Sequence, residues 1–481
     1  MTSARLLALL AGTAALLGGC AVGPNHVPPE PPVPVGFSGA QDARFSSQAV
    51  TPQLWRSFGE PELNALIERA LAENRSLSQA RARLDEARAL RGLTVFGLFP
   101  TVTAAAERER SEPSSLDPFL PVGQAAATTY RSGFDASWEI DVFGASRRAA
   151  AAARGEASAR EADWRAVQAA TVAEVAQAWF ALRGAEQRRA IEREALANFA
   201  ENLRILERQL EAGRGTDLDV SRARGQIADV AARLPDTDLE VTRQEQRLAV
   251  LVVASVEQLR TQWLAAERAV PSLAPIVAVG SPEDWLRRRP DIRAAEQRLA
   301  AATARIGVEQ AQWWPRITLL GGFGYTAQDR DDLFTATAER WRYGPSLTWS
   351  FLEAGRVRQR VRAARSRAAG ALAAYDETVL RALEETENAF AAYRAANQSL
   401  AANEAGLVAS RRAAELAAVR YDAGASDFLV VLDAERSRLD FQSRVVQSAV
   451  ARATALAAIN KALAGDFAQA RDAAAPASAA E

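Results

Sequence analysis

Two copies of one structural plan follow each other in this chain, and this repeat restricts the fold more than any other feature. The segments around two tryptophans match in character, YRSGFDASWEIDVFG in the first copy and WRYGPSLTWSFLEAG in the second. We therefore predict one unit over residues 53–267 and a second over 268–465. Each should contain a helix, two strands, a very long helix, a tight turn and a returning long helix. Three residue pairs that lie 211 positions apart mark the repeat: Trp138 with Trp349, Gly144 with Gly355, and Gly213 with Gly424.

Each copy contains a long segment without proline and with little glycine, from about Ser146 to Ala212 and from Arg356 to Ala423. Their Ala, Arg, Glu, Gln and Leu residues favour a helix, which would extend over roughly 100 Å at about 1.5 Å per residue. Apolar residues recur in them at spacings of three and four, as in a coiled-coil-like packing stripe. This stripe comprises Val172, Val175, Trp179 and Leu182 in the first copy and Val379, Leu383, Thr386, Phe390 and Tyr393 in the second.

Each long helix is expected to turn back at a glycine, giving one helical hairpin that turns at 213–219 and another at 424–430. Gly213 and Gly424 stand just past the helix ends. Glycine adopts the left-handed cap conformation there without strain.

Two strand candidates precede the long helix in each copy, at about 101–110 and 129–143 and at about 316–326 and 341–352. Apolar and polar residues alternate in three of them, whereas the first alternates poorly. About ten residues are enough for a tilted strand to cross a bilayer, and aromatic residues gather towards the strand ends, as in interfacial girdles. Two hairpins of a soluble sheet with one buried face would show the same alternation, so the pattern alone leaves both interpretations open.

Four strands cannot close a barrel by themselves. Open sheet edges are not tolerated in hydrocarbon, because the unpaired backbone groups have no water to bond. If these strands lie in lipid, the protein must form an oligomer that shares one barrel. The predicted fold class is therefore mainly α with a transmembrane β-barrel portion, built from two repeats that each hold a strand pair and a long helical hairpin.

The N-terminus indicates export and lipidation. Residues 1–19 combine Arg5 with a short apolar run and predict a secretory signal peptide. Small residues before Cys20 resemble the lipobox of bacterial lipoproteins, which implies that Cys20 becomes an acylated (palmitate-bearing) N-terminus sorted to the bacterial outer membrane. An ordinary signal peptide with an incidental cysteine is the alternative. Residues 20–52 would form a lipidated, proline-rich linker, and the tail 466–481 is predicted to be disordered.

The composition excludes most enzyme classes. With one cysteine and one histidine, His26, the chain can form neither an internal disulfide nor a multi-histidine metal site, and we expect no cofactor. A formal net charge of -1 gives no sign of nucleic-acid binding. The charged runs Arg287–Arg289 and Glu384–Glu385 are typical of solvated helix faces, and no acid–base constellation emerges. We therefore expect that the protein is not an enzyme.

Three passages resemble the outer-membrane efflux protein family of TolC-type ducts, most closely its lipoprotein branch of OprM-like and NodT-like members. They are CAVGPNHVPPEPPVP at the N-terminus, LRRRPDIRAAEQRLAAATARIGVEQAQWWPRITLLGGFG in the second copy, and RYDAGASDFLVVLDAERSRL from Arg420 to Leu439. The resemblance implies a homotrimer with one shared twelve-stranded barrel and a periplasmic tunnel of twelve helices. It also implies a passive exit duct for drugs or other small molecules, as in multidrug resistance. An inner-membrane RND-type pump would supply the energy, and a periplasmic adaptor protein would bridge pump and duct.

The resemblance further places a periplasmic gate at the helix tips. Tyr421 and Gly424 match the tyrosine and glycine of the family's second turn, and Asp219 matches the aspartate that bonds the gate tyrosine in TolC. Ser426 stands where TolC has a gate arginine. This departure implies that the charged lock of TolC is either weaker here or built from other residues.

Two more residues of the gate follow the second turn. Leu429 and Asp433 match the apolar and acidic positions that ring the aperture in OprM-like members, and the turns at Gly213 and Gly424 would contact the adaptor. The residues alone leave simpler interpretations open. Asp433 also fits a solvated helix residue. Tyr421 also fits a packing aromatic near a helix end, and Asp219 also fits a helix cap.

Two alternative functions remain at this point. The first is a type I protein-secretion duct of the same fold. The second is a periplasmic coiled-coil scaffold lipoprotein, which would explain the long helices and Cys20 but not two strand pairs rimmed by aromatic residues.

Overall fold

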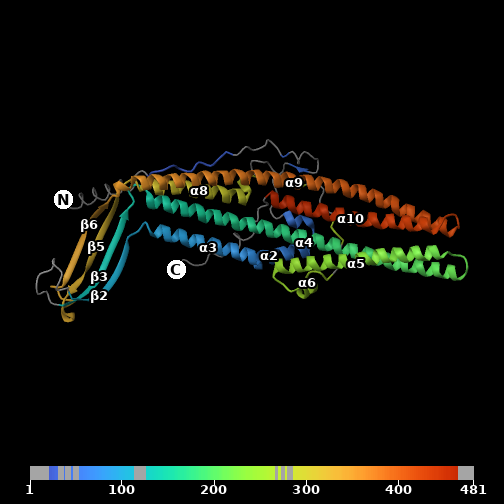
Figure 1. The fold of residues 1–481 in the computed structure, drawn as a ribbon, viewed down its shortest axis with the longest axis horizontal. Coiled ribbons are helices and arrows are strands. Elements are labelled where there is room, and N and C mark those ends of the chain that lie inside the picture. Colours follow the sequence, from blue (N-terminus) through green and yellow to red (C-terminus); the bar gives the residue numbers. More distant parts are fainter. Residues whose placement is uncertain are drawn as a thin grey trace. The chain divides into compact units, whose positions relative to one another are not determined.

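The computed structural model describes residues 21–30, 37, 45–46, 54–112, 126–265, 269–271, 277–278, 285 and 287–463, and the chain divides into two compact units (Figure 1). The first unit is drawn from residues 1–30, 83–161 and 294–375, and the second from 31–82, 162–293 and 376–481. Each unit therefore contains segments of both copies of the repeat. The predicted signal peptide, Cys20 and the predicted tail lie outside the described residues.

Helices make up most of the described chain, which confirms the prediction of a mainly α-helical chain. Two of them are very long, because no proline or capping signal interrupts them: α4 (Ala145–Glu211) has 67 residues and α9 (Ala354–Asp422) has 69. Within the described residues, no helix is both long and apolar enough to span a bilayer. The other helices are α2 (Pro61–Glu73), α3 (Arg75–Phe96), α5 (Asp217–Val252), α6 (Val256–Gln262), α8 (Pro290–Ala311) and α10 (Phe428–Ala462).

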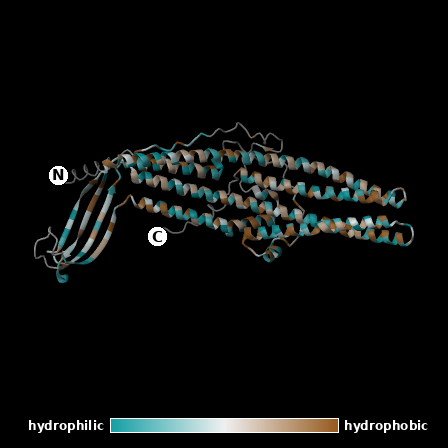
Figure 2. Cartoon of the chain, in the orientation of Figure 1, coloured by the Kyte–Doolittle hydropathy of each residue, from teal (hydrophilic) through white to brown (hydrophobic). Residues whose placement is uncertain are grey.

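The first unit contains one antiparallel sheet of four strands in the order β2-β3-β5-β6, to which each copy contributes one hairpin. In the described part of the chain, β2 and β6 pair on one side only, so both edges of this sheet carry unpaired backbone groups. Hydrophobic residues lie along the strands (Figure 2), and some are largely exposed: Trp341 is 67% exposed and Tyr343 is 82% exposed. The strands are β2 (Thr101–Ser111), β3 (Ala127–Ile140), β5 (Arg316–Ala327) and β6 (Glu339–Thr348).

Two strands end earlier than the sequence predicts. β3 ends at Ile140 rather than at residue 143, because Asp141 turns away to cap α4 and accepts the backbone amides of Ser146 (3.0 Å) and Arg147 (2.8 Å). β6 ends at residue 348 rather than 352, because Phe351–Glu353 form a 3-10 turn that leads directly into α9. Capping and turn formation at a helix start thus override the alternation that continues in the sequence.

One hydrogen bond recurs at the equivalent place in each copy of the repeat. The indole Nε1 of Trp138 donates to the carbonyl of Leu98 at 3.0 Å, and Nε1 of Trp349 donates to the carbonyl of Trp313 at 3.2 Å. Both acceptors lie two residues before a proline that precedes a strand. Each bond therefore ties the strand that leads to a long helix to the end of the preceding short helix.

The core of the second unit follows the predicted packing stripes. Val175, Trp179 and Leu182 of α4 are fully buried, and Phe390 of α9 is as well. Before α2, the short strand β1 (Phe45–Ser46) pairs in parallel with β4 (Val277–Ala278). The ring of Phe45 packs on Phe390 with 4.9 Å between centroids, which attaches this N-terminal segment to the core.

Candidate functional site

The two helical hairpins turn through the same backbone geometry. After α4, Gly213 has φ 68°, and its amide donates to the carbonyl of Leu210 at 2.9 Å. After α9, Gly424 has φ 69°, and its amide donates to the carbonyl of Tyr421 at 2.9 Å. A positive φ of this size strains any residue with a Cβ atom, which explains why both copies of the repeat hold glycine here.

Behind these turns, the ends of all four helices share one hydrophobic cluster, which we call the helix-tip cluster. Short side chains and large ones alternate in it, so the helices approach closely. The partly buried ring of Tyr421 packs against it, with its centroid 5.3 Å from that of Phe428. The cluster consists of Leu206, Val220, Ala223, Ala417, Phe428, Val431 and Leu432.

The hydroxyl of Tyr421 links the two hairpins. It donates a hydrogen bond of 2.9 Å to Oε1 of Gln209, which lies in the last turn of α4. Burial raises the pKa of Tyr421, and the negative charges of Asp219 and Asp422 raise it further, whereas the bond to Gln209 opposes this shift. The phenol is therefore neutral at physiological pH and keeps the proton that it donates.

Asp219 does not bond the tyrosine, in contrast to the pattern implied by the resemblance to TolC. Its backbone amide donates to Oγ1 of Thr216 at 3.2 Å, and the Thr216 hydroxyl donates back to the Asp219 carboxylate at 2.6 Å. Arg222, one turn further along α5, lies 4.0 Å from the same carboxylate. The contacts of Asp219 within the chain are thus those of a helix cap. Thr216 is the N-cap residue of α5, and its hydroxyl bonds both the backbone amide and the carboxylate of Asp219.

Leu429 and Asp433 lie on one exposed face of α10. A spacing of four residues places them one above the other, and Leu429 is 48% exposed. Asp433 is exposed, and among the described residues it has no ion-pair partner within 4 Å. An apolar side chain and an unpaired carboxylate are therefore available for contact with a neighbouring molecule or with solvent.

Ser426 does not replace the missing arginine of the TolC lock. Its hydroxyl is buried and has no hydrogen-bond partner within the described ranges. The contact between the two turns is made instead by Tyr421 and Gln209. Sequence reasoning missed Gln209, because a glutamine near a helix end is an ordinary surface residue and its partner stands 212 positions away.

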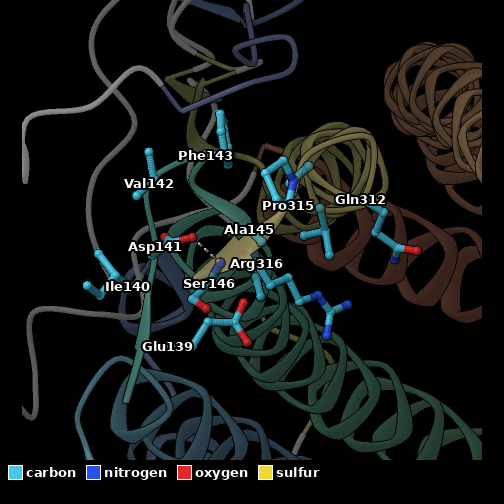
Figure 3. A pocket seen from close by; sticks show the side chains of 13 residues that line it. Glu139, Ile140, Asp141, Val142, Phe143, Ala145, Ser146, Gln312, Pro315 and Arg316 are labelled. Atoms are coloured by element: carbon cyan, nitrogen blue, oxygen red, sulfur yellow. Dashed lines mark hydrogen bonds between the residues drawn. The ribbon is translucent and has the colours of Figure 1, made fainter. Parts of the chain in front are cut away.

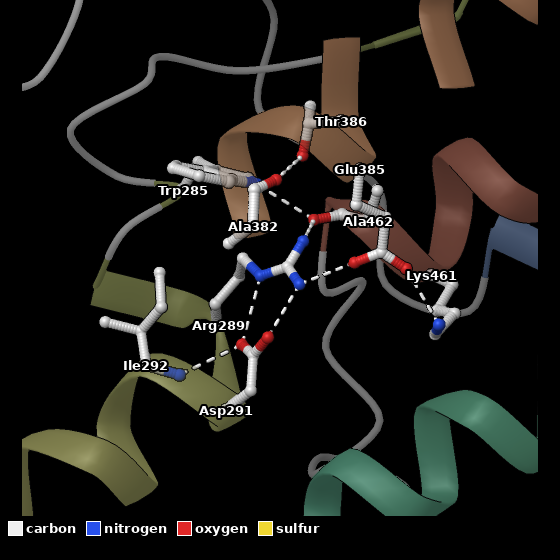
Figure 4. A network of polar contacts seen from close by, with 9 residues as sticks. All are labelled: Trp285, Arg289, Asp291, Ile292, Ala382, Glu385, Thr386, Lys461 and Ala462. Atoms are coloured by element: carbon white, nitrogen blue, oxygen red, sulfur yellow. Dashed lines mark hydrogen bonds and ion pairs between the residues drawn. The ribbon is translucent and has the colours of Figure 1, made fainter. Parts of the chain in front are cut away.

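The charged run before α8 is a second feature that the sequence analysis misjudged. Arg289 is 5% exposed, and its partner Glu385 is only partly exposed and bonded to it, so neither is a solvated helix charge. Two nitrogens of Arg289 bond the carboxylate of Asp291 at 3.0 and 2.7 Å, and Nη2 also reaches Glu385 at 2.7 Å (Figure 4). This network joins the start of α8 to the middle of α9.

The same network also holds the end of α10. Nη1 of Arg289 donates to the carbonyl of Ala462 at 2.9 Å, and Nζ of Lys461 donates to Glu385 at 2.7 Å. Burial alone would lower the pKa of Arg289, but the hydrogen bonds and charges of Asp291 and Glu385 outweigh it and raise the pKa. Burial would likewise raise the pKa of Glu385, and the bonds from Lys461 and Arg289 lower it instead. Arg289 and Glu385 are therefore both charged at neutral pH.

Comparison with known proteins gives one consistent family. The chain matches the family described as "Outer membrane efflux protein" over residues 66–269 and 282–465. Outer membrane protein OprJ of Pseudomonas aeruginosa is 32% identical over 472 residues, which are 98% of this chain and 96% of OprJ. Nodulation protein T of Rhizobium leguminosarum bv. viciae is 31% identical over 455 residues, which are 94% of this chain and 92% of that protein. The solved structure of the outer-membrane channel OprN has a TM-score of 0.88 and 36% identity, and the match covers 93% of this chain and 99% of that chain.

Proposed function

Because the chain belongs to the outer membrane efflux protein family and is an efflux duct of the outer membrane, we propose that it is the passive exit channel of a tripartite pump. It conducts drugs or other small molecules from the periplasm to the exterior without chemical conversion. The observation that carries this proposal is a sheet of four strands with two unpaired edges and exposed aromatic side chains. The scaffold alternative is disfavoured, because the family match includes both strand pairs.

The unpaired edges support a homotrimer. In a bilayer, the backbone groups of β2 and β6 need partners, and rotational symmetry supplies them when β6 of one protomer pairs with β2 of the next. Three sheets of four strands then form one closed barrel of twelve strands. The hairpins of α4 and α5 and of α9 and α10 extend it as a tunnel of twelve helical segments in the periplasm.

We assign the gate of this tunnel to the helix tips. Around a threefold axis, three copies of the face with Leu429 and Asp433 form an apolar ring and an acidic ring. Three carboxylates on a narrow axis repel one another and attract cations, so the closed pore should prefer cations. The bond between Tyr421 and Gln209 holds the two hairpins together and keeps these rings narrow.

The turns at Gly213 and Gly424 are the proposed contacts for a periplasmic adaptor protein, which connects the duct to an inner-membrane RND-type pump. Both turns are exposed, and nothing fills the space where a Cβ of either glycine would lie. Cysteines placed at Arg214 and Ala425 should cross-link to the adaptor in cells that express the whole pump. Failure at both turns would contradict this assignment.

We also propose that Cys20 carries acyl chains and holds the N-terminus at the outer membrane. The residues that follow support this, because Val22 bonds back to the base of the sheet: its amide donates to the carbonyl of Phe143 at 3.1 Å. Labelled palmitate should enter the wild-type protein and not the Cys20→Ser variant. Equal labelling of both proteins would exclude the cysteine as the attachment point.

The channel function is tested by single-channel recording in planar bilayers. The purified protein should give discrete conductance steps that favour potassium over chloride, and Asp433→Asn should reduce this preference at least about twofold by removing the acidic ring. Asp440→Asn is the matched control, because Asp440 lies on the same helix but is paired with Arg444 at 2.6 Å. Properly inserted protein that gives no conductance at any voltage would refute the proposal.

A further inference from the structure

The first turns of α9 and the end of α8 form a pocket of about 560 Å³ in the first unit. Three arginines of α9 line one wall, and two tryptophans that follow α8 line another. Val22, from the N-terminal segment, also lines the pocket, and Gln310 and Val361 complete the lining beside the six residues on which the argument rests. These six residues are Val22, Trp313, Trp314, Arg358, Arg362 and Arg365.

The three arginines form one face of positive charge. Their spacing of four and three residues puts Arg358, Arg362 and Arg365 on the same side of α9. All three are exposed, and among the described residues none has an ion-pair partner within 4 Å. The neighbouring Arg356 does have one, since it bonds Glu353 at 2.9 Å. The pocket wall therefore carries three positive charges that no residue in the described part of the chain neutralises.

The other copy of the repeat neutralises the equivalent position. In the first copy, beside a pocket of about 210 Å³ that residues of both copies line, Asp141 points its carboxylate at the backbone amide of Ser146 (Figure 3) and accepts Nε of Arg147 at 3.2 Å. At the offset of the repeat, Arg358 corresponds to Arg147, but Leu352 stands in the place of the aspartate. The second copy thus keeps the arginine and lacks its carboxylate.

The second copy also gains charge. Arg362 corresponds to Ala151 of the first copy, so the pocket wall on α9 holds an arginine where α4 has a methyl group. Helix packing does not require this arginine, because it is exposed. Loss of an acid and gain of a base in the same place indicate a site for an anion.

Two observations place this pocket at the level of lipid headgroups. Exposed aromatic and aliphatic side chains stand immediately before α9, where Phe351 is 63% exposed and Leu352 is 87% exposed. At about 1.5 Å per residue, Arg358 lies roughly 6 Å and Arg362 roughly 12 Å along the helix from Ala354. Val22, which lines the pocket, follows Cys20, the proposed site of the acyl anchor, by two residues in the sequence.

We propose that this pocket binds the phosphate headgroup of an anionic phospholipid in the periplasmic leaflet of the outer membrane. This inference rests on the proposed function for the side of the membrane on which the pocket lies. Guanidinium groups bind phosphate oxygens in bidentate geometry, and indoles favour the ester region just above the hydrocarbon. The bound lipid fixes the start of α9 against the bilayer beside the anchored N-terminus.

Binding is measured by calorimetric titration of full-length protein, purified in a non-ionic detergent, with dioctanoyl phosphatidylglycerol. An arginine near an anionic surface strengthens binding about fivefold, so the variant with Arg358→Gln, Arg362→Gln and Arg365→Gln should bind at least about tenfold more weakly. The zwitterionic dioctanoyl phosphatidylethanolamine should also bind at least about tenfold more weakly to the wild type. The matched control changes three exposed arginines of α9 outside the pocket, Arg381, Arg411 and Arg412, to glutamine and should retain wild-type affinity.

Each arm decides one part of the proposal. Equal affinity of the pocket variant and the wild type would overturn the site, and displacement of the lipid by an equal concentration of inorganic phosphate would reassign it to free phosphate. If the triple variant does not fold, Arg362→Gln alone serves as the test. This variant should fold, because the first copy has alanine at the equivalent position, and it should bind the lipid about fivefold more weakly because one positive charge is lost. The pocket variant should keep the single-channel conductance of the wild type, which separates the lipid site from the channel function. The proposed channel function itself is contradicted only if the wild type does not conduct.

Discussion

The Arg289→Ala variant should unfold at a melting temperature several degrees below that of the wild type, after a loss of about 2 to 4 kcal/mol of folding free energy. The substitution leaves the carboxylates of Asp291 and Glu385 and the carbonyl of Ala462 without their shared donor. Removal of one partner from a fully buried pair costs about 3 to 5 kcal/mol, and we place this case slightly lower because the carboxylates are 38% and 34% exposed. Circular dichroism of the detergent-solubilised protein measures the change.

Arg293→Ala is the matched control, because Arg293 is an exposed arginine in the first turn of α8, four residues after Arg289. Its melting temperature should equal that of the wild type. The lowered pKa of Glu385 adds a pH test: its contribution to stability is present above the ordinary pKa of 4.5 and is lost as the pH falls through the lowered value. Wild type and Glu385→Gln should therefore converge in acid. If Arg289→Ala and Arg293→Ala have the same melting temperature, the network does not stabilise the fold.

The double variant Tyr421→Phe with Asp433→Ala should open the pore in planar bilayers. Tyr421→Phe removes one hydroxyl and its bond to Gln209 but keeps the ring that packs on Phe428. One hydrogen bond is worth about 1 kcal/mol, and three copies in a trimer give about 3 kcal/mol, or roughly a 100-fold change in the ratio of closed to open states. Asp433→Ala removes the acidic ring and shortens the side chains that narrow the aperture there. We therefore expect a larger mean conductance than in the wild type.

The matched control is the double variant Tyr393→Phe with Asp440→Ala. It makes the same chemical changes on α9 and α10 but away from the helix tips, so it tests whether the position of the changes matters. This control should conduct like the wild type. Because the pKa of Tyr421 is raised, its closing bond is fully present below the ordinary tyrosine pKa of 10 and is lost as the pH rises through the raised value. Wild-type conductance should therefore increase in strong alkali, and that of the double variant should not. Identical conductance of variant and wild type at neutral pH would place closure elsewhere in the tunnel.

The sequence predicts the features that depend on local pattern. The helical turns at Gly213 and Gly424 and the packing stripe of α4 both follow from residues within a few positions of one another. The strand ends do not follow, because Asp141 belongs to the alternating pattern of β3 but makes a stronger contact as the cap of α4. Local competition between two structures is not visible in alternation alone.

The site contacts were harder to predict, because they join residues far apart in the chain. The partner of Tyr421 lies 212 positions away, and Arg289 bonds Glu385 at a separation of 96 and Ala462 at 173. A run of three arginines is usually solvated, and only the packing of α8, α9 and α10 buries the third of them. Residue type at each position indicates possible chemistry, whereas the partner depends on the tertiary fold.

The central claim is that one chain supplies a third of a closed barrel in the outer membrane. The most direct test is the native mass of the full-length protein, extracted from outer membranes in a mild detergent and measured without cross-linking. We expect the mass of three chains, since β2 and β6 then pair between protomers. A stable, correctly inserted single chain would contradict it, because the two open edges of its sheet would have to lie in hydrocarbon without partners.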